Sequence, residues 1–388
     1  MRPIYLDNQA TTPIDPKVLL AMQPWLNNYF GNSASMNHIY GWEASEAVEK
    51  ARDHVAKIIC SNSREIVFTS GATESNNIAL IGAARFYRKK GNHIITLNTE
   101  HKAVLDVLAY LSKEGFQITQ VPVKKNGIID LEKFANSINE KTILVSIMHA
   151  NNEIGVIQPI KQLGTICKNN DIIFHVDAAQ STGKIPIDVN EMNIDLLSIS
   201  GHKFYAPKGV GALFIRKQNP KIELEPIIYG GGHERNIRPG TMAVQNIVGL
   251  GAACNIAKKN MHVENKIIKN LRDKLLVSIQ NQFNSTFLNG CNINRLSGNL
   301  NLGFKNLNSE SIISSSPEIA ISTGSACTST SKSPSHVLLS LGLSKNQALS
   351  SIRISIGRFN TEEEIDQAGY VLCNSIKKLQ NIKSLFTK

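Results

Sequence analysis

The sequence predicts an α/β protein built on a large, mostly parallel sheet, with a smaller α+β domain toward its C-terminal end. Two observations indicate this fold class. From about residue 38 to 216, short apolar runs alternate with segments of helical period. Near-continuous apolar runs are typical of strands that helices cover on both faces. After Gly240 this alternation stops, and a different and smaller unit is expected.

The large domain is expected to begin with an amphipathic helix over 38–59, where apolar residues recur at 44, 47, 48, 51, 55, 58 and 59. Short apolar runs then predict strands, and segments of helical period predict helices between several of them. The strands are EIVFTS (65–70), HIITL (93–97), FQITQVPV (116–123), TILVSIM (142–148), IIFHVD (172–177), LLSIS (196–200) and GALFIR (211–216). The helices are 73–90, 102–115 and 158–170.

Beyond Gly240 the sequence predicts two long helices, at about 241–260 and 263–283. A strand is expected at SIRISIG (351–357), followed by a final helix that opens with the capping-box spacing of Thr361 and Glu364. We therefore expect two domains with a boundary near residue 256. The large domain takes 14–256, and the small α+β domain takes 1–13 together with 257–388.

Composition excludes several classes of protein. The 388 residues are 42% hydrophobic and 19% charged, which is ordinary for a globular protein. The net charge is +11, but the lysines are dispersed, so direct binding of nucleic acid is not expected. The N-terminus carries Asp7 and no apolar h-region, and no run of about 18 apolar residues occurs. We expect a cytoplasmic protein with no membrane contact.

The cysteines and histidines show no metal-binding pattern. The six cysteines are widely spaced, with no CxxC pair, and the ten histidines include no HExxH. Free thiols and no metal site are therefore expected.

Two strand ends carry residues that suit a pyridoxal phosphate site. Lys203 follows the strand LLSIS in SGHK, and Asp177 ends the strand of HVDAAQ. Neighbouring strand ends would bring both to one crevice, where an amine can form a Schiff base and a carboxylate can keep the pyridine nitrogen protonated. The alternatives are a surface lysine in a loop and an aspartate that caps the next turn.

Three further features are compatible with such a site. In TSGATESNN (69–77) a strand-to-helix turn can hold a phosphate through backbone N–H groups and the Ser70 and Thr73 hydroxyls. His101 opens the helix after TE, where it either stacks on a cofactor ring or only caps the helix. Arg353 lies in the strand SIRISIG and is expected to pair with a carboxylate, from either a substrate or a structural acid.

Cys327 stands among small polar residues in STGSACTSTSKSPSH (322–336). Free cysteines are usually buried as small hydrophobes, and this one has almost nothing apolar around it. The composition predicts an accessible thiol on a segment, about 323–335, of high mobility.

Taken together, and in their order along the chain, these motifs resemble one family. It is that of the pyridoxal-phosphate-dependent cysteine desulfurases of the IscS/NifS type, within the class V aminotransferases. The resemblance covers residue 5 to about 359 and implies the aspartate-aminotransferase-like fold (type I) and a homodimer. The matching stretches are YLDNQATTP, EIVFTSGATESNN, TEHKAVLD, SIMHANNEIGV, FHVDAAQSTGK, SGHKFYAPKGVGAL, GGGHERNIRPGT, STGSACTS and SSIRISIGRF.

The resemblance implies a role for each matched residue around the cofactor. Lys203 matches the Schiff-base lysine and Asp177 the partner of the pyridine nitrogen, while Gln180 matches the residue bonded to the phenolate oxygen. His101 matches a ring-stacking histidine that shuttles protons. Thr241 matches a phosphate contact donated by the other subunit. The remaining phosphate contacts fall on Ala72, Thr73, Ser200 and His202.

The implied reaction converts L-cysteine to L-alanine. Asn152 and Arg353 match residues that hold the substrate carboxylate, and Asn152 also matches a residue at the cofactor. Cys327 matches the nucleophile that accepts the sulfur as a persulfide. The sulfur would serve iron–sulfur cluster assembly through a scaffold protein, or other acceptors such as those of tRNA thiolation. The alternatives are another enzyme of the same cofactor, such as a selenocysteine lyase or an aminotransferase, and a non-catalytic binding protein.

Overall fold

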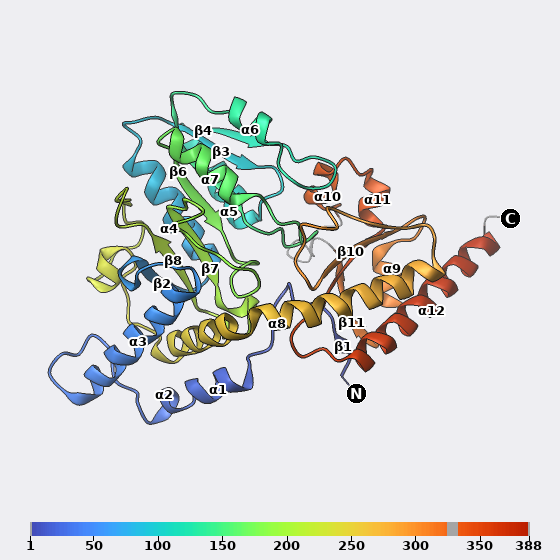
Figure 1. The fold of residues 1–388 in the computed structure, drawn as a ribbon, viewed down its shortest axis with the longest axis horizontal. Coiled ribbons are helices and arrows are strands. Elements are labelled where there is room, and N and C mark those ends of the chain that lie inside the picture. The colour runs from blue at the N-terminus through green and yellow to red at the C-terminus, as the bar shows by residue number, and fades with distance from the viewer. Residues whose placement is uncertain (1, 324–332, 387–388) are drawn as a thin grey trace.

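The computed structural model describes residues 2–323 and 333–386, and in these residues the expected strands of the large domain form one seven-stranded sheet (Figure 1). Each strand pair is parallel except the two made by β8, which is antiparallel to both of its neighbours. In spatial order the strands are β2 (Ile66–Thr69), β8 (Gly211–Ile215), β7 (Leu196–Ser200), β6 (Ile173–Asp177), β5 (Thr142–Met148), β3 (His93–Leu97) and β4 (Gln117–Val121).

Helices cover both faces of this sheet, which explains why its strands are apolar on both sides. Successive strand residues alternate between two cores, so Val145 packs into one and Leu144 into the other. Side chains from α4 (Ala72–Phe86) and α5 (Lys102–Lys113) fill the core with Leu144. The opposite core takes side chains from α1 (Pro16–Met22), α3 (Ile39–Ile58), α6 (Leu131–Asn136) and α7 (Ile160–Asn169).

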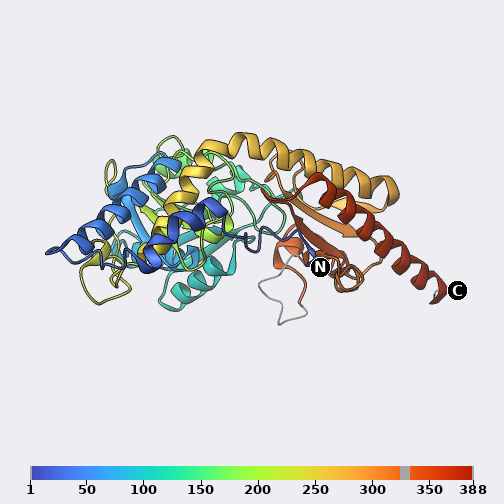
Figure 2. The same cartoon turned by 90° about the horizontal axis from the view of Figure 1, so that it is seen from below.

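The prediction of two helices after Gly240 is wrong, because α8 (Val244–Gln282) is one helix of 39 residues. The stretch between the two expected helices contains no glycine or proline, so nothing in the chain interrupts the helix. Its first half packs in the core of the large sheet and its second half in a separate core. Figures 1 and 2 show α8 running along both parts of the molecule.

A second sheet lies toward the C-terminal end and is antiparallel. Its strands, in spatial order, are β12 (Ser322–Thr323), β13 (Ser351–Ser355), β10 (Asn299–Phe304) and β9 (Thr286–Leu288). It packs against α8 and α12 (Glu362–Phe386), which begins with the expected capping box of Thr361 and Glu364. The shorter helices are α2 (Pro24–Asn27), α9 (Ser309–Ser314), α10 (His336–Ser340) and α11 (Lys345–Leu349).

The N-terminal segment lies in the same part of the molecule as the second sheet. Its strand β1 (Ile4–Tyr5) pairs in parallel with β11 (Ile319–Ala320). The division of the chain into 14–256 and 1–13 with 257–388 remains a prediction. Within the described residues no helix combines the length and the apolar character that crossing a bilayer requires.

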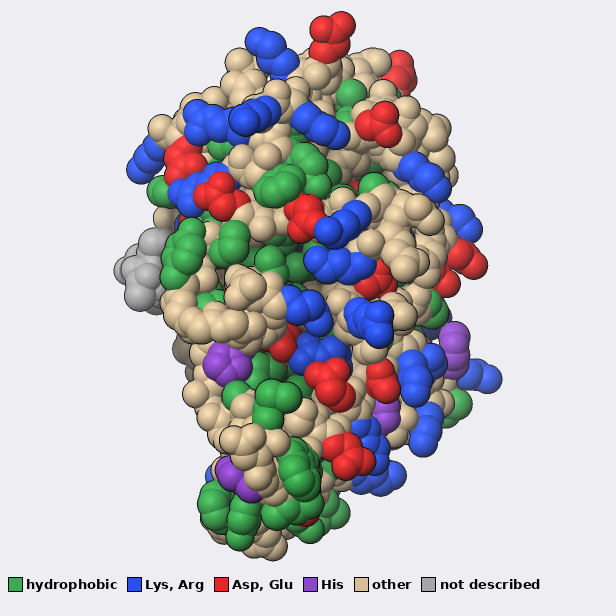
Figure 3. Space-filling model, turned by 90° about the vertical axis from the view of Figure 1, so that its left-hand side faces the viewer, with side chains coloured by type: hydrophobic (Ala, Val, Ile, Leu, Met, Phe, Trp, Pro, Cys, Tyr) green, Lys and Arg blue, Asp and Glu red, His purple; other side chains and the backbone are tan. Residues whose placement is uncertain are grey.

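Large apolar side chains are exposed on α1 and on the chain from α2 into α3. Leu20, Phe30, Met36 and Trp42 are each more than half exposed, Met36 at 82%. Figure 3 shows hydrophobic side chains gathered at the lower end of one face, over this region. An apolar patch of this kind is typical of a surface that a protein partner covers.

Gly211 lies in β8, between β2 and β7, and its lack of a side chain allows the backbone around it to approach closely. A Cβ there would lie 2.4 Å from the Ile199 carbonyl oxygen and 2.6 Å from the Gly71 Cα. We predict that Gly211→Ala lowers the free energy of unfolding by about 1–3 kcal/mol, measured by chemical denaturation. Gly232→Ala is the control, since its φ is −94° and the nearest atom to its added Cβ is 3.6 Å away. Equal stability of the two variants would contradict the prediction.

Candidate active site

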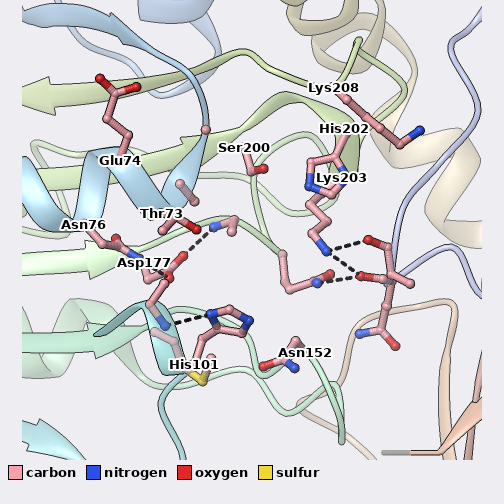
Figure 4. Close-up of a pocket in the computed structure, with 18 of the residues that line it drawn as sticks. Thr73, Glu74, Asn76, His101, Asn152, Asp177, Ser200, His202, Lys203 and Lys208 are labelled. Atoms are coloured by element: carbon pink, nitrogen blue, oxygen red, sulfur yellow. Dashed lines mark hydrogen bonds between the residues drawn. The ribbon is translucent and has the colours of Figure 1, made fainter. Parts of the chain in front are cut away.

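The carboxyl ends of β6 and β7, together with the loops after β2, β3 and β5, enclose a cavity of about 490 Å³ (Figure 4). This is the edge where open α/β sheets bind their ligands. Most of the residues expected at the site line the cavity. They are Ala72, Thr73, His101, Asn152, Asp177, Gln180, Ser200, His202, Lys203 and Arg353.

Thr241 and Cys327 complete the residues expected at the site. Thr241, which the resemblance assigns to the site of the other subunit, is exposed and is not among the residues that line the cavity. Cys327 lies outside the described residues, as does most of 323–335, so the predicted mobility of that segment stays a prediction.

Lys203 reaches the cavity from a short 3₁₀ helix, Gly201–Lys203, directly after β7. Its Nζ donates hydrogen bonds to the backbone carbonyls of Gln9, at 2.9 Å, and Ala10, at 2.7 Å. The alternative of a surface lysine is therefore wrong. The side chain is held against the N-terminal segment, with its amine at the wall of the cavity.

Asp177 ends β6 and faces the same space from the opposite side (Figure 4). One carboxylate oxygen accepts a hydrogen bond from the Ala179 N–H at 2.9 Å, and the other accepts one from Asn76 Nδ2 at 2.8 Å. Asp177 therefore caps the next turn and also lines the cavity, while its role toward a pyridine nitrogen stays a prediction. The Asn76 Oδ1 atom is buried without a partner.

The turn before α4 is open toward the cavity. Gly71 has a φ of +154°, and no atom lies within 4 Å of the place where its Cβ would be. The helix has no side-chain cap at its N-terminus, so its first N–H groups are available to an anion. Glu74 lies in this first turn, where its carboxylate pairs with Arg238 at 2.8 Å and accepts the Ser70 N–H at 2.5 Å.

His101 both caps a helix and lines the cavity. Its Nδ1 accepts a hydrogen bond from the Ala103 N–H at 3.1 Å, as an N-cap of α5. The neutral ring therefore carries its proton on Nε2. Figure 4 shows the ring lying between Asp177 and Asn152.

Arg353 approaches the cavity from β13 of the second sheet. It is 2% exposed, and its guanidinium donates to Asp7 at 2.8 Å and to the Asn152 carbonyl at 2.9 Å. Of the two partners expected for Arg353, a substrate carboxylate or a structural acid, the structure shows a structural acid, Asp7. The buried Nε of Arg353 has no hydrogen-bond partner, which leaves donor capacity beside the cavity.

Glu153 is a buried acid next to Asn152. Burial raises the pKa of its carboxyl to about 7, although a hydrogen bond from the Ser335 hydroxyl and the charges of Arg353 and His101 act in the opposite direction. Ser335 caps α10, whose side chains pack on Ile154. Glu153 therefore connects the wall of the cavity to the residues that follow the segment of Cys327.

Several lining residues have no site role that the sequence predicts. Gln9 and Ala10 lie in the stretch YLDNQATTP, a motif that carries the resemblance without implying a role for either residue. Asn76 lies one helical turn beyond Thr73, and a buried asparagine in an otherwise apolar helix face is the signal that would have identified it. Glu74, Met148 and Lys208 are among the others.

Known proteins resemble this chain over nearly its whole length. Residues 4–368 match the family model described as aminotransferase class-V. Cysteine desulfurase IscS of Rickettsia bellii is 53% identical over 384 residues, which cover 99% of this chain and 93% of that protein. A solved NifS-like protein has a TM-score of 0.90 at 37% identity, and covers 97% of this chain with 99% of its own length. The solved structure of SspA in complex with cysteine has a TM-score of 0.82 at 38% identity, over 92% and 100% of the two chains.

The chain belongs to the class V aminotransferase family and has the pyridoxal phosphate type I fold. Members of the family use pyridoxal phosphate as their cofactor. The cavity fits this group, because an amine and a carboxylate face each other across it. The open turn at Gly71 adds free backbone donors for a phosphate, at the end of the cavity nearest α4.

The raised pKa of Glu153 predicts a pH-dependent stability difference. A carboxyl whose pKa is higher in the folded than in the unfolded state contributes stability below about pH 4.5, and this contribution is lost as the pH rises to about 7. Glutamine does not ionise, so Glu153→Gln removes this pH-dependent loss of stability. We predict that, relative to the parent, the variant gains about 1–3 kcal/mol of unfolding free energy between about pH 5 and pH 8.

Chemical denaturation at the two pH values measures this difference. Glu140→Gln changes an exposed acid and serves as the control, with no pH-dependent gain expected. A Glu153→Gln variant whose stability follows the parent at both pH values would contradict the buried, protonated state of Glu153.

Proposed function

We propose that the chain converts L-cysteine to L-alanine, with pyridoxal phosphate as cofactor and Cys327 as the acceptor of the sulfur. The observation that carries the proposal is the convergence of Lys203, Asp177, His101 and Arg353 on one cavity. The chain is also 53% identical to a protein named cysteine desulfurase, and its fold is similar to that of SspA in complex with cysteine.

The cavity offers a place for each part of the cofactor. Lys203 would hold the aldehyde carbon, Asp177 the pyridine nitrogen and Gln180 the phenolate oxygen. The phosphate would lie at the N-terminus of α4, near Ala72, Thr73, Ser200 and His202. When bound, the cofactor supplies an electron-withdrawing ring that stabilises negative charge on the substrate's α-carbon.

The chain's own residues bind the substrate and move its protons. We propose that Arg353 and Asn152 hold the carboxylate of cysteine, since both residues line the cavity and Arg353 carries a positive charge. His101 holds a proton at Nε2, because its Nδ1 accepts the Ala103 N–H. Nε2 is therefore the nitrogen through which we propose that His101 exchanges protons with the substrate.

Sulfur transfer requires a thiolate, for which Cys327 is the proposed source. The sulfur–sulfur bond forms as the carbon–sulfur bond of the substrate breaks. The electron pair of the broken bond stays with the carbon, which takes up a proton to become the methyl group of alanine. Cys327 keeps the sulfur as a persulfide. Cytoplasmic delivery to an iron–sulfur scaffold protein, or to proteins of tRNA thiolation, completes the proposal.

We predict that Cys327→Ser abolishes sulfide release from cysteine, by at least about 100-fold, because serine cannot accept the sulfur. The variant still binds cysteine, so addition of cysteine still changes the absorbance of the loaded protein. Cys60→Ser is the control, since Cys60 is exposed and does not line the cavity. Undiminished sulfide release by Cys327→Ser would favour a lyase that forms no persulfide, or another aminotransferase-like reaction.

We also propose a homodimer, supported by the apolar surface on α1 and on the chain from α2 into α3. Phe30 is 70% exposed and its ring lies 5.4 Å from that of Tyr40. A second copy of the chain would cover these side chains and bring its Thr241 to the phosphate.

Phe30→Glu is predicted to weaken the dimer by at least about tenfold, because it places a charge in an apolar contact. Sedimentation velocity measures the change. Ile293→Glu is the control, since Ile293 is 89% exposed and lies outside the α1–α3 region. A parent protein that sediments as a monomer, or equal weakening by both variants, would refute this interface.

A further inference from the structure

The loop from residue 230 to 241 has an unusual backbone that the proposed mechanism does not use. Three successive residues, Glu234, Arg235 and Asn236, have φ angles of 46°, 58° and 65°. Residues other than glycine rarely adopt this left-handed conformation in succession. Such a backbone persists only where surrounding contacts fix it, and it is commonest at functional sites. The loop is therefore a candidate for a role at the site.

Glu234 anchors this loop to β2, the edge strand of the large sheet. Its carboxylate accepts two hydrogen bonds from Arg52 of α3, both at 2.7 Å, and one from the Phe68 N–H at 2.6 Å. Arg52 and Arg235 each donate to the Ile66 carbonyl. Both members of the Arg52–Glu234 pair are buried. The loop is thus fixed on the strand that leads into the turn before α4.

Arg238, four residues after Glu234, contacts the first turn of α4. Its Nε donates a hydrogen bond to Glu74 Oε1 at 2.8 Å, and the two side chains are 27% and 14% exposed. Pro239 follows Arg238 and restricts its backbone, and the Gly240 N–H donates to His233 Nδ1 at 3.3 Å. The loop therefore holds Arg238 on Glu74, in contrast to the flexible ion pairs of an exposed surface.

Glu74 is an acid at the place where the phosphate of the cofactor is expected. It lines the cavity, and Figure 4 shows it next to Thr73 at the start of α4. An acid in the first turn stabilises a helix, but its charge repels a phosphate bound at the same turn. Burial acts to raise the pKa of Glu74, but hydrogen bonds from Arg238 and Ser70 outweigh it and lower this pKa. The carboxylate is therefore charged at neutral pH.

We propose that Arg238 is a positioning residue of the cofactor site, which pairs with Glu74 so that the start of α4 can accept a phosphate. The loop that Glu234 anchors holds Arg238 at this position. The inference rests on the proposed function, because it takes pyridoxal phosphate as the ligand of the cavity.

The role follows from the charges at this end of the cavity. A carboxylate without a partner would stand beside the negative charge of the phosphate, in partly buried surroundings where water screens charges less than in solution. The guanidinium of Arg238 offsets that charge. Arg238 itself is not among the residues that line the cavity, so we expect it to act through Glu74 and not by touching the ligand. Its loss should matter only while Glu74 is charged.

The test compares two ligands that differ in the phosphate alone. The full-length chain, freed of cofactor by dialysis, is titrated with pyridoxal 5′-phosphate and with pyridoxal, and the absorbance of each complex gives its dissociation constant. We expect Arg238→Met to weaken the binding of pyridoxal phosphate by about tenfold. The affinity for pyridoxal should stay within about twofold of the parent's, because no phosphate is present to be repelled.

A double-mutant cycle separates the action of Arg238 on Glu74 from a direct action on the phosphate. Glu74→Gln alone should bind pyridoxal phosphate at least as tightly as the parent. In the Glu74→Gln background, Arg238→Met should leave the affinity within about twofold of the parent's. Arg238→Lys retains the charge and should lose less affinity than Arg238→Met.

Arg85→Met is the matched control. Arg85 lies in the last turn of the same helix and pairs with Glu114 at 2.6 Å, at similar exposure, but neither residue lines the cavity. Loss of this second Arg–Glu pair should leave both affinities unchanged.

Equal weakening of both ligands by Arg238→Met would overturn the proposal, since it would indicate a general structural role. Weak binding that persists in the double variant would also overturn it. If Arg238→Met does not fold, Arg238→Gln takes its place in the cycle. Neither titration uses cysteine, so absence of desulfurase activity in a chain that binds the cofactor refutes the proposed function alone. A parent that binds no pyridoxal phosphate refutes both.

Discussion

The segment from Leu6 to Thr12 is hydrogen-bonded to both sheets of the molecule, and the geometry of the site depends on it. On one side, Gln9 donates its N–H to the Ser355 hydroxyl of β13, at 2.9 Å. On the other, the Thr12 N–H donates to the His202 carbonyl at 2.9 Å. Between these anchors the carbonyls of Gln9 and Ala10 accept the amine of Lys203. This segment, which contains a turn at residues 8–10, thus places the second sheet, with Arg353, against the strand ends of the first.

Positive charge predominates around the cavity, partly because burial raises the pKa of nearby carboxyl groups. Lys203, Lys208 and Arg353 line it, with Lys184 just behind Gln180. Three acids near it are either paired with a cation or have a raised pKa. Glu74 is paired with Arg238, whereas burial raises the pKa of Glu153 to about 7 and that of Glu100 well above its ordinary range. The surplus of cations suits ligands that carry a phosphate and a carboxylate.

The sequence predicted the large sheet well because its strands are buried on both faces and therefore appear as uninterrupted apolar runs. It predicted Lys203 and Asp177 at one cavity because both follow neighbouring strands of that sheet. It failed at α8, where a polar stretch resembled a break but lacked any residue that ends a helix. It also did not predict the contacts of Gln9 with Gln180 and Lys203, because these join segments more than 170 residues apart.

The central claim is that sulfur passes from cysteine to Cys327, and a single-turnover experiment with sulfur-labelled cysteine tests it most directly. The loaded protein is mixed with less than one equivalent of labelled cysteine, and alanine and the cysteine peptides are then quantified by mass spectrometry. The account predicts one labelled sulfur on Cys327 for each alanine formed. Alanine formed without a labelled Cys327 peptide, or label on Cys60 instead, would contradict it.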